Sequence, residues 1–191
     1  TVAKIPGLKR IRYTSPHPQD ITEDLLETMA SHANICNYVH LPLQAGSDRI
    51  LKRMNRTYSR DYFTNLAGRV REVLPNCGIS TDIIVGFPGE TDAEFKETLD
   101  VMEEIKFDSA FTFKYSPRRG TKAAEYEDQI VEEDKQTRLE KVIAAQKSHT
   151  LERNQHYVGR VESVLAEKNS KRSIHQLAGR TDSNKWVIFD K

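Results

Sequence analysis

Four loops of the sequence contain the residue types that bind ligands, and each follows a short β-type run. The runs are 9–15, 37–43, 79–85 and 109–115. In chains that alternate strands and helices, reacting groups lie at the carboxyl ends of the strands, where the following loops converge. We therefore expect a ligand site built from these loops, which are rich in proline, glycine and polar residues. They are 15–18, 43–48, 86–91 and 116–121.

The loop 86–91 carries the clearest chemical signal of the four. Gly86 and Gly89 would let a ligand approach the backbone closely. The helix predicted to begin at Thr91 has an N-terminus that can hold a negative group. A tight turn between a strand and a helix would use the same glycines, so this loop alone leaves both interpretations open.

Three single residues allow both a structural and a functional interpretation. No Cys, His or carboxylate with ligand spacing stands near His40, which favours a hydrogen-bonded interior histidine over a metal ligand. Asp82 lies inside a strand, where burial is costly without a partner. We expect for it either a functional role or an ion pair with Lys114 on the next strand. His17 stands between two prolines and is interpreted as a loop residue that can face a substrate.

The elements that must position these residues alternate between strand and helix. Helical periodicity follows the first three runs, and a long amphipathic helix is predicted over about 131–155. Strands connected by helices of this length pair in parallel, because a parallel connection needs a crossover of a dozen or more residues. Candidate caps precede the helices: the pairs Asp20–Glu23 and Thr91–Glu94, and the single residues Ser47 or Asp48 and Ser59.

An open twisted sheet and a closed βα barrel both fit this order of strands and helices. The alternation of polar and apolar residues within the strands distinguishes between them. Strands between two layers of helices usually form unbroken apolar runs. Here polar residues recur at every second position, with His40 and Gln44 in one run and Ser80 and Asp82 in another. Such alternation is typical of a wet or ligand-filled interior. The sequence therefore favours a βα barrel over an open twisted sheet.

The pattern changes after the long predicted helix. Residues 156–191 contain seven basic and four acidic residues, whereas 1–155 contain 22 basic and 24 acidic residues. Short β-type segments and frequent turns here indicate the start of a small all-β module. Two domains are therefore predicted, 1–155 and 156–191. The expected segments are a strand over 158–165, a solvated hairpin loop over 167–173, and strands over 176–181 and 186–189.

Composition excludes several classes of protein. With 37% hydrophobic and 30% charged residues and a mean hydropathy of -0.65, the chain is neither collagenous nor disordered. No stretch approaches the roughly 18 apolar residues of a membrane helix, and no signal-peptide pattern opens the sequence, so we expect a cytoplasmic protein. A net charge of +1 excludes a uniformly basic coat for nucleic acid. Two cysteines, Cys36 and Cys77, cannot supply a disulfide framework.

Five segments together form a specific pattern: TSPHP at 14–18, HLPLQAGSD at 40–48, LKRMNR at 51–56, STDIIVGFPGET at 80–91 and FKYSPRRGT at 113–121. In order and through nearly the whole chain, they closely resemble the radical S-adenosylmethionine methylthiotransferases. The SPHP loop is most similar to the MiaB branch, the tRNA-2-methylthio-N6-dimethylallyladenosine synthases. The segments 159–162, 179–181 and 187–189 are similar to the opening of the TRAM domain, a small RNA-binding β-barrel.

The resemblance implies a fold, a reaction and a set of cofactors. The fold is the later part of a parallel βα barrel of the radical SAM type, followed by a truncated TRAM module. Enzymes of this family insert sulfur and a methyl group at C2 of N6-dimethylallyladenosine next to the anticodon, using S-adenosylmethionine and two 4Fe-4S clusters. Carried over by motif, the cofactor-binding residues are Gln44, Ser47, Asp82, Gly86, Glu90, Tyr115 and Ser116.

The resemblance also implies partners, which are the tRNA anticodon loop and an electron donor such as flavodoxin or ferredoxin. No membrane partner is expected. Basic side chains pair with single-stranded RNA through its phosphates. The residues expected to contact RNA are His17, Arg118, Arg119, Lys171, Arg172 and Arg180.

One element of the family pattern has no counterpart in this sequence. The family holds its radical cluster on a C-x-x-x-C-x-x-C loop, and Cys36 and Cys77 each precede a strand, at the end opposite the chemistry. We therefore expect no cluster in this chain, no assigned catalytic residue, and a fragment that is inactive by itself. Two alternatives remain open: a non-catalytic tRNA-binding module, and methylthiolation of a ribosomal protein side chain.

Overall fold

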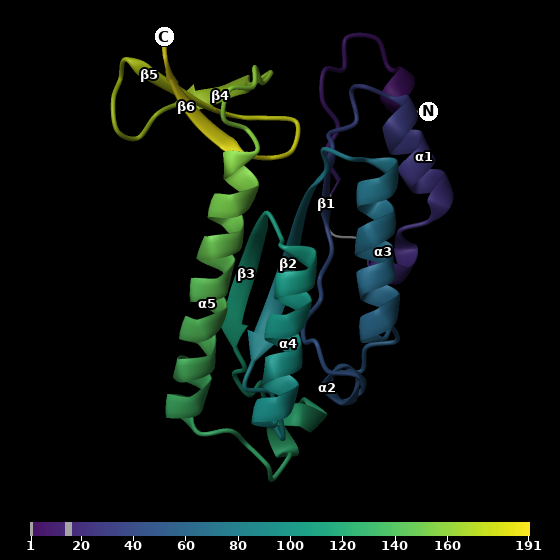
Figure 1. Cartoon of the computed structure of the whole chain (residues 1–191), viewed down its shortest axis with the longest axis vertical. Helices are drawn as coiled ribbons and strands as arrows, with labels where there is room; N and C mark the ends of the chain where they lie inside the picture. The colour runs from purple at the N-terminus through teal and green to yellow at the C-terminus, as the bar shows by residue number, and fades with distance from the viewer. Residues whose placement is uncertain (1, 14–16) are drawn as a thin grey trace.

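The computed structural model describes residues 2–13 and 17–191, which form two separate three-stranded sheets (Figure 1). The first sheet is parallel, in the order β1-β2-β3. The second is antiparallel, in the order β4-β5-β6. The strands are β1 (Tyr38–His40), β2 (Gly78–Val85), β3 (Ser109–Lys114), β4 (Leu165–Asn169), β5 (Gln176–Arg180) and β6 (Trp186–Asp190).

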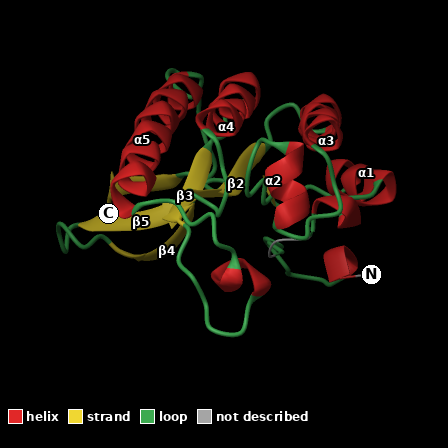
Figure 2. Cartoon of the chain, turned by 90° about the horizontal axis from the view of Figure 1, so that it is seen from below, coloured by secondary structure: helices red, strands yellow, loops and turns green. Residues whose placement is uncertain are grey.

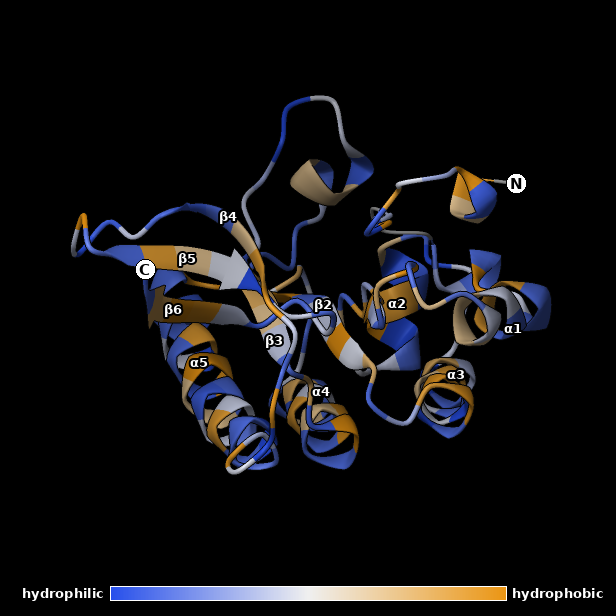
Figure 3. Ribbon diagram, turned by 90° about the horizontal axis from the view of Figure 1, so that it is seen from above, coloured by the Kyte–Doolittle hydropathy of each residue, from blue (hydrophilic) through white to orange (hydrophobic). Residues whose placement is uncertain are grey.

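Helices α3, α4 and α5 form an arc along one face of the parallel sheet (Figure 2). Each combines hydrophilic and hydrophobic residues (Figure 3), as expected of helices that bury one side. The core between helices and sheet includes Phe63, Val101 and Val142 from the helices and Val39 and Ile83 from the sheet region. The helices are α1 (Glu23–Ser31), α2 (Asp48–Arg53), α3 (Arg60–Val73), α4 (Asp92–Ile105) and α5 (Glu132–Gln155), with 3-10 turns η1 (Val2–Lys4), η2 (Pro18–Asp20) and η3 (Lys122–Glu125).

Side-chain caps start most of the helices where the sequence indicates. The predicted caps at Ser47, Ser59 and Thr91 are confirmed, the last within a complete capping box. The predicted pair of Asp20 with Glu23 is wrong. Asp20 belongs to η2, and the hydroxyl of Thr22 caps α1 by accepting the Leu25 N–H at 3.3 Å.

Polar side chains share one face of the parallel sheet, as the alternation predicts. His40 pairs with Ser80 and Asp82 pairs with Phe111, and paired positions in a sheet point to the same side. The parallel βα arrangement predicted from the sequence is confirmed. Within the described residues the sheet does not close into a barrel, and Phe111 on β3 remains 57% exposed.

The predicted strand over 9–15 is wrong for its described part, 9–13. Ile11 makes one parallel bridge to Ile35 and nothing more regular forms there. Backbone pairing is confined to Ile11, whose N–H donates to the Asn34 carbonyl and whose carbonyl accepts from the Cys36 N–H. The side chains of the flanking arginines reach toward the second sheet. Arg10 donates to the carbonyl oxygen of Arg180 at 2.5 Å, and Arg12 donates to that of Thr181 at 2.8 Å. Residues 14 and 15 of that run lie outside the described residues.

The strand predicted over 158–165 is wrong except at Leu165, whereas the hairpin loop predicted over 167–173 is confirmed for 170–173, between the antiparallel strands β4 and β5. β4 begins only at Leu165 and includes Lys168, which the sequence placed in a hairpin loop. Residues 156–159 form a turn after α5 instead of a strand, and Gly159 at its end adopts a positive φ of 79°. The apolar Val158 and Val161 are exposed, so their alternation did not indicate a buried face. The strands predicted over 176–181 and 186–189 are confirmed as β5 and β6.

The antiparallel sheet contacts the amino-terminal ends of the parallel strands (Figure 1). Asp182 accepts the Asn37 N–H just before β1 at 2.9 Å, and the Lys185 ammonium lies 2.8 Å from the Asp108 carboxylate just before β3. At Gly78 an added Cβ would lie 2.4 Å from the Ser183 carbonyl oxygen. The carboxyl ends of the strands are therefore free to form a separate site. In the described part of the chain, every helix is too short or too polar to cross a membrane.

Candidate functional site

A cavity of about 1030 Å³ opens at the carboxyl ends of the parallel strands. Five residues predicted to face a ligand line it: Gln44, Asp82, Tyr115, Ser116 and Arg118. The remaining wall comes from the turn after α2 and from the segment 121–126. A smaller hollow of about 510 Å³ lies between β3 and α5, away from all of the predicted site residues.

Asp82 faces this cavity and contacts His40. The Nε2 atom of His40 lies 3.3 Å from the Asp82 carboxylate, and its Nδ1 lies 2.7 Å from the Ser80 hydroxyl. The interpretation of His40 as a hydrogen-bonded interior histidine is confirmed. The predicted ion pair of Asp82 with Lys114 is wrong, since Lys114 pairs with Glu132 on α5. Asp82 lies opposite Phe111, three positions from Lys114 along β3, so the two charged side chains leave the sheet from opposite faces. Lys114 still borders the cavity, because it is the last residue of β3.

Gln44 is held in a strained conformation at the cavity wall. Its φ of 70° is unusual for a residue with a side chain. Two backbone hydrogen bonds to β2 fix it: Gln44 donates to the Asp82 carbonyl at 2.8 Å and accepts from the Ile84 N–H at 2.9 Å. Strain of this kind persists only where the surroundings determine it, and it concentrates at ligand sites.

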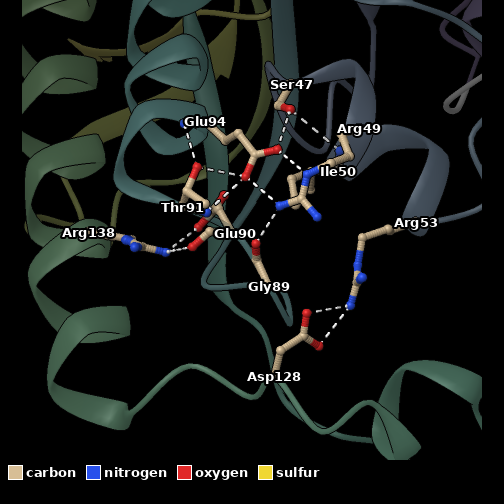
Figure 4. A network of polar contacts seen from close by, with 10 residues as sticks. All are labelled: Ser47, Arg49, Ile50, Arg53, Gly89, Glu90, Thr91, Glu94, Asp128 and Arg138. Atoms are coloured by element: carbon tan, nitrogen blue, oxygen red, sulfur yellow. Dashed lines mark hydrogen bonds and ion pairs between the residues drawn. The ribbon is translucent and has the colours of Figure 1, made fainter.

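In the loop 86–91, Phe87 lines the cavity, whereas the Glu90 side chain turns back to the start of the loop and to α5 (Figure 4). The Glu90 carboxylate accepts the Gly86 N–H at 2.7 Å, and Arg138 on α5 donates to both the carboxylate and the carbonyl oxygen of Glu90 at 2.9 Å. Burial raises the pKa of Glu90, while the Gly86 N–H and Arg138 oppose the rise. Glu90 and Gly86 therefore lie behind the cavity wall and fix the shape of the loop.

Arg138 supports the loop behind the candidate site, and the sequence did not single it out. In the sequence it is one of several charged positions on a long helix, 48 residues from Glu90. Its guanidinium also donates to Asp92 at 2.8 Å, so one side chain joins α5 to the end of the loop and to the first residue of α4. Only the three-dimensional packing of α5 brings these groups together.

A second polar network joins α2 to the same loop (Figure 4). The Glu94 carboxylate accepts from Arg49 at 2.6 Å, from the Ser47 hydroxyl at 3.2 Å and from the Thr91 N–H at 2.9 Å. Arg49 also donates to the Gly89 carbonyl at 2.5 Å. The hydrogen bonds from Arg49 and then Thr91 lower the pKa of Glu94 to about 2, against the opposing effect of burial. Ser47 is thus a helix cap behind the cavity.

This depressed pKa predicts a pH-dependent effect of changing Arg49. A carboxyl whose folded pKa lies near 2 stabilises the fold above its ordinary pKa of 4.5 and loses that contribution as pH falls toward 2. Arg49→Met is therefore expected to be less stable than the parent at pH 6 and to approach it near pH 2.5. Urea unfolding at both pH values measures this. Lys96→Met, which removes an exposed pair with Asp100, is the matched control, and an equal deficit at both pH values would contradict the prediction.

The segment 116–131 is fastened to the cavity edge. Arg53 donates to both carboxylate oxygens of Asp128 at 2.8 and 2.9 Å, and its guanidinium lies 4.5 Å from the centre of the Tyr126 ring. The Asp128 carbonyl accepts the Gly89 N–H at 2.7 Å. Phe87 packs against the rings of Tyr115 and Tyr126, with centroids 5.0 and 6.4 Å away. These contacts give one wall of the cavity an aromatic character.

The residues predicted to contact RNA do not share one surface. Arg118 lines the cavity, Arg119 follows it in the same exposed loop, and His17 packs against Tyr58 with ring centroids 5.3 Å apart. The other three belong to the antiparallel sheet or its hairpin, at the opposite ends of the parallel strands. They are Lys171, Arg172 and Arg180, the last paired with Glu167 at 2.8 Å.

The two cysteines lie away from the cavity, directly before β1 and β2 in the chain. Burial raises the pKa of both thiols, that of Cys77 to about 12. Throughout 2–13 and 17–191, no three His, Cys, Asp or Glu side chains gather closely enough to hold a metal ion. The described residues therefore do not fit a metal cluster.

Comparison with known proteins adds three findings. The Radical SAM superfamily profile matches residues 2–102. The tRNA-2-methylthio-N(6)-dimethylallyladenosine synthase of Carboxydothermus hydrogenoformans is 48% identical over 99% of this chain and 43% of its own length, and that of Acetivibrio thermocellus is 46% identical over 99% and 39%. The chain thus spans about two fifths of the length of the relatives it matches.

Among solved structures, the coproporphyrinogen III oxidase of Escherichia coli, described as a radical SAM enzyme, superimposes with a TM-score of 0.58. The superposition covers 70% of this chain and 31% of that chain, with 21% sequence identity. At this identity it shows a similar fold only. The fold predicted from the sequence, part of a parallel βα barrel followed by a small β module, is confirmed.

Proposed function

Because the chain belongs to the Radical SAM superfamily, we propose that it is the part of a tRNA methylthiotransferase that binds S-adenosylmethionine and presents the target base. The whole protein would insert sulfur and a methyl group at C2 of N6-dimethylallyladenosine next to the anticodon. The observation that carries this proposal is the cavity at the carboxyl edge, whose walls contain Gln44, Asp82, Tyr115 and Ser116. Similarity to two proteins named as synthases of this specificity, at 48% and 46% identity over 99% of the chain, supports it.

The cavity residues fit S-adenosylmethionine in size and chemistry. The cavity volume of about 1030 Å³ suits a nucleoside-sized ligand together with part of a second ligand. The Asp82 carboxylate and the Gln44 amide offer hydrogen-bond partners to a ribose or an amino acid group, and Tyr115 offers an aromatic face to adenine. When bound, S-adenosylmethionine would supply the radical chemistry and the methyl group. Glu90 and Ser47 would act from behind, by holding the loops that carry these residues.

The iron-sulfur clusters of this chemistry do not fit the described residues. Cys36 and Cys77 are buried at the amino ends of the strands, and the raised pKa of each thiol disfavours the thiolate that a cluster needs. We therefore assign the cluster ligands to other parts of the whole protein. An electron donor such as flavodoxin or ferredoxin would serve those clusters.

Nucleoside analysis of tRNA tests the proposal. The whole protein is expressed in a bacterial strain that lacks its own tRNA methylthiotransferase, and digested tRNA is examined by mass spectrometry. We expect the 2-methylthio derivative of N6-dimethylallyladenosine with the unchanged protein, and its loss when Asp82→Ala removes the cavity carboxylate. Glu104→Ala, which removes a carboxylate from an exposed position of α4 outside the cavity lining, is the matched control for expression. Unmodified tRNA with the unchanged protein, or a methylthio group on a ribosomal protein, would overturn the assignment.

A further inference from the structure

Six cations line the cavity, and they fall into two groups by their partners. Arg53 and Lys114 are neutralised by Asp128 and Glu132. In the part of the chain that the structure describes, the other four form no ion pair. We call these four residues the basic rim: Lys52, Arg56, Arg118 and Lys122.

The basic rim is not balanced by acidic groups within the cavity. Asp82 is the one carboxylate among the lining residues, and it contacts His40. The chain as a whole carries a net charge of only +1, so the concentration of positive charge at this opening is local. A cleft lined by charge of one sign raises the local concentration of a ligand of opposite charge.

Arg56 adds a second observation, because part of its guanidinium is buried without a partner. Its Nε atom has no hydrogen-bond acceptor among the described residues. The backbone fixes the residue there, since Asn55 adopts a φ of 59° and the Arg56 N–H donates to the Leu51 carbonyl at 2.9 Å. The Nε atom of Arg53, which also lines the cavity, is buried without a partner too, as are those of Arg12 and Arg71 elsewhere. A ligand with acceptor oxygens in the cavity would pair with the free nitrogens of Arg53 and Arg56.

The rim is carried by two separate segments of the chain. Lys52 and Arg56 belong to α2 and the turn after it, whereas Arg118 and Lys122 belong to the segment that follows β3. The Arg53–Asp128 pair joins these two segments. Between them the cavity offers the rings of Tyr115 and Tyr126. Cations combined with aromatic faces are the usual means of binding single-stranded nucleic acid, in which bases stack and phosphates pair with basic groups.

We propose that the basic rim binds the phosphates of RNA nucleotides on both sides of the base that enters the cavity. The assignment rests on the proposed function and names the residues through which it would recognise its substrate. The carboxylates of an acidic peptide would also be attracted by the positive charge of the basic rim. The aromatic wall favours RNA, because a peptide of carboxylates has no base to stack there.

The salt dependence of RNA binding tests this proposal. Binding of a fluorescein-labelled anticodon stem-loop RNA to the chain is followed by fluorescence anisotropy over a range of salt concentrations. Each lost phosphate contact makes the log-log slope shallower by about 0.7 for single strands. For Lys52→Gln combined with Lys122→Gln we expect a slope shallower by about 1.4 and, for each lost contact, an affinity about tenfold lower at low salt. Both lysines are exposed, so the fold should be retained.

Two controls separate the possible outcomes. Lys4→Gln combined with Lys141→Gln removes the same charge from exposed positions outside the cavity lining and should leave the slope unchanged. Arg56→Gln should weaken binding, and Arg56→Lys should restore part of the slope. An unchanged slope in the rim variant would overturn the rim assignment, while tRNA methylthiolation by the whole protein would still support the proposed function. Tighter binding of a labelled polyglutamate peptide than of RNA would assign the rim to a protein ligand and contradict this proposal.

Discussion

Arg138→Ala is expected to lower the free energy of unfolding by about 3–5 kcal/mol, because it leaves the Glu90 carboxylate buried without its cationic partner. The side chains of Glu90 and Arg138 are only 1% and 8% exposed, so solvent cannot replace the lost contact. Arg138 also donates to the Glu90 carbonyl and to Asp92, and both bonds disappear with it. Equilibrium unfolding in urea at neutral pH, followed by circular dichroism, measures the loss.

Three comparisons identify the buried charge as the cause of that loss. Lys96→Ala breaks an exposed ion pair with Asp100 and should change stability by no more than about 0.5 kcal/mol. Lowering the pH should narrow the deficit of Arg138→Ala, since protonation removes the uncompensated charge of Glu90. Glu90→Met combined with Arg138→Met should be more stable than Arg138→Ala. A deficit that does not change with pH and persists in the double variant would show that lost packing is responsible.

Gly46→Ala is expected to cost about 2–3 kcal/mol of unfolding free energy, because the new methyl group would overlap the backbone of α4. An added Cβ would lie 2.5 Å from both the Glu97 carbonyl oxygen and the Thr98 Cα. Backbone atoms inside a helix cannot move aside as a flexible side chain would. The loop must withdraw, which also breaks the hydrogen bond from the Gly46 N–H to the Thr98 hydroxyl at 2.9 Å.

Gly68→Ala provides the matched control for this substitution. Gly68 lies within α3, and no heavy atom would come within 4 Å of its added Cβ. Alanine in an unstrained helical position should stabilise the protein by about 0.5–1 kcal/mol, because glycine is the more flexible residue in the unfolded chain. Thermal unfolding of both variants should therefore give shifts of opposite sign. A Gly46→Ala protein as stable as the parent would show that the loop has room to adjust.

Local sequence patterns predicted those parts of the fold that depend on neighbouring residues. The cap at Ser59 and the capping box of Thr91 with Glu94 need only residues three positions apart, and both are confirmed. A strand over 9–15 would need backbone partners that lie far away in the sequence. Within 9–13 the structure gives one parallel bridge, from Ile11 to Ile35, which no local pattern contains.

The candidate site shows the same division between local and long-range information. Loops that follow parallel strands converge at the carboxyl edge of the sheet, which predicted the loops that form the site. Four of the predicted residues do line one cavity: Gln44, Asp82, Tyr115 and Ser116. The sequence did not show that Glu90 supports the cavity wall from behind, because this role depends on its contact with Arg138 on α5. The predicted ion pair of Asp82 with Lys114 is wrong because of the strand register. Asp82 lies opposite Phe111, and odd and even positions of β3 face opposite sides of the sheet.

The single helix α5 joins the region of the cavity to the antiparallel sheet, and its length sets how far apart they lie (Figure 1). At a rise of 1.5 Å per residue, its 24 residues extend about 36 Å. A ligand that touched both Arg118 and Arg180 would therefore need a rigid reach of this order. A folded hairpin lying lengthwise beside the helix can span this distance. Inserting one helical turn into α5 would lengthen the helix by about 5.4 Å, and it would also disturb the contacts of Asp182 with Asn37 and of Lys185 with Asp108.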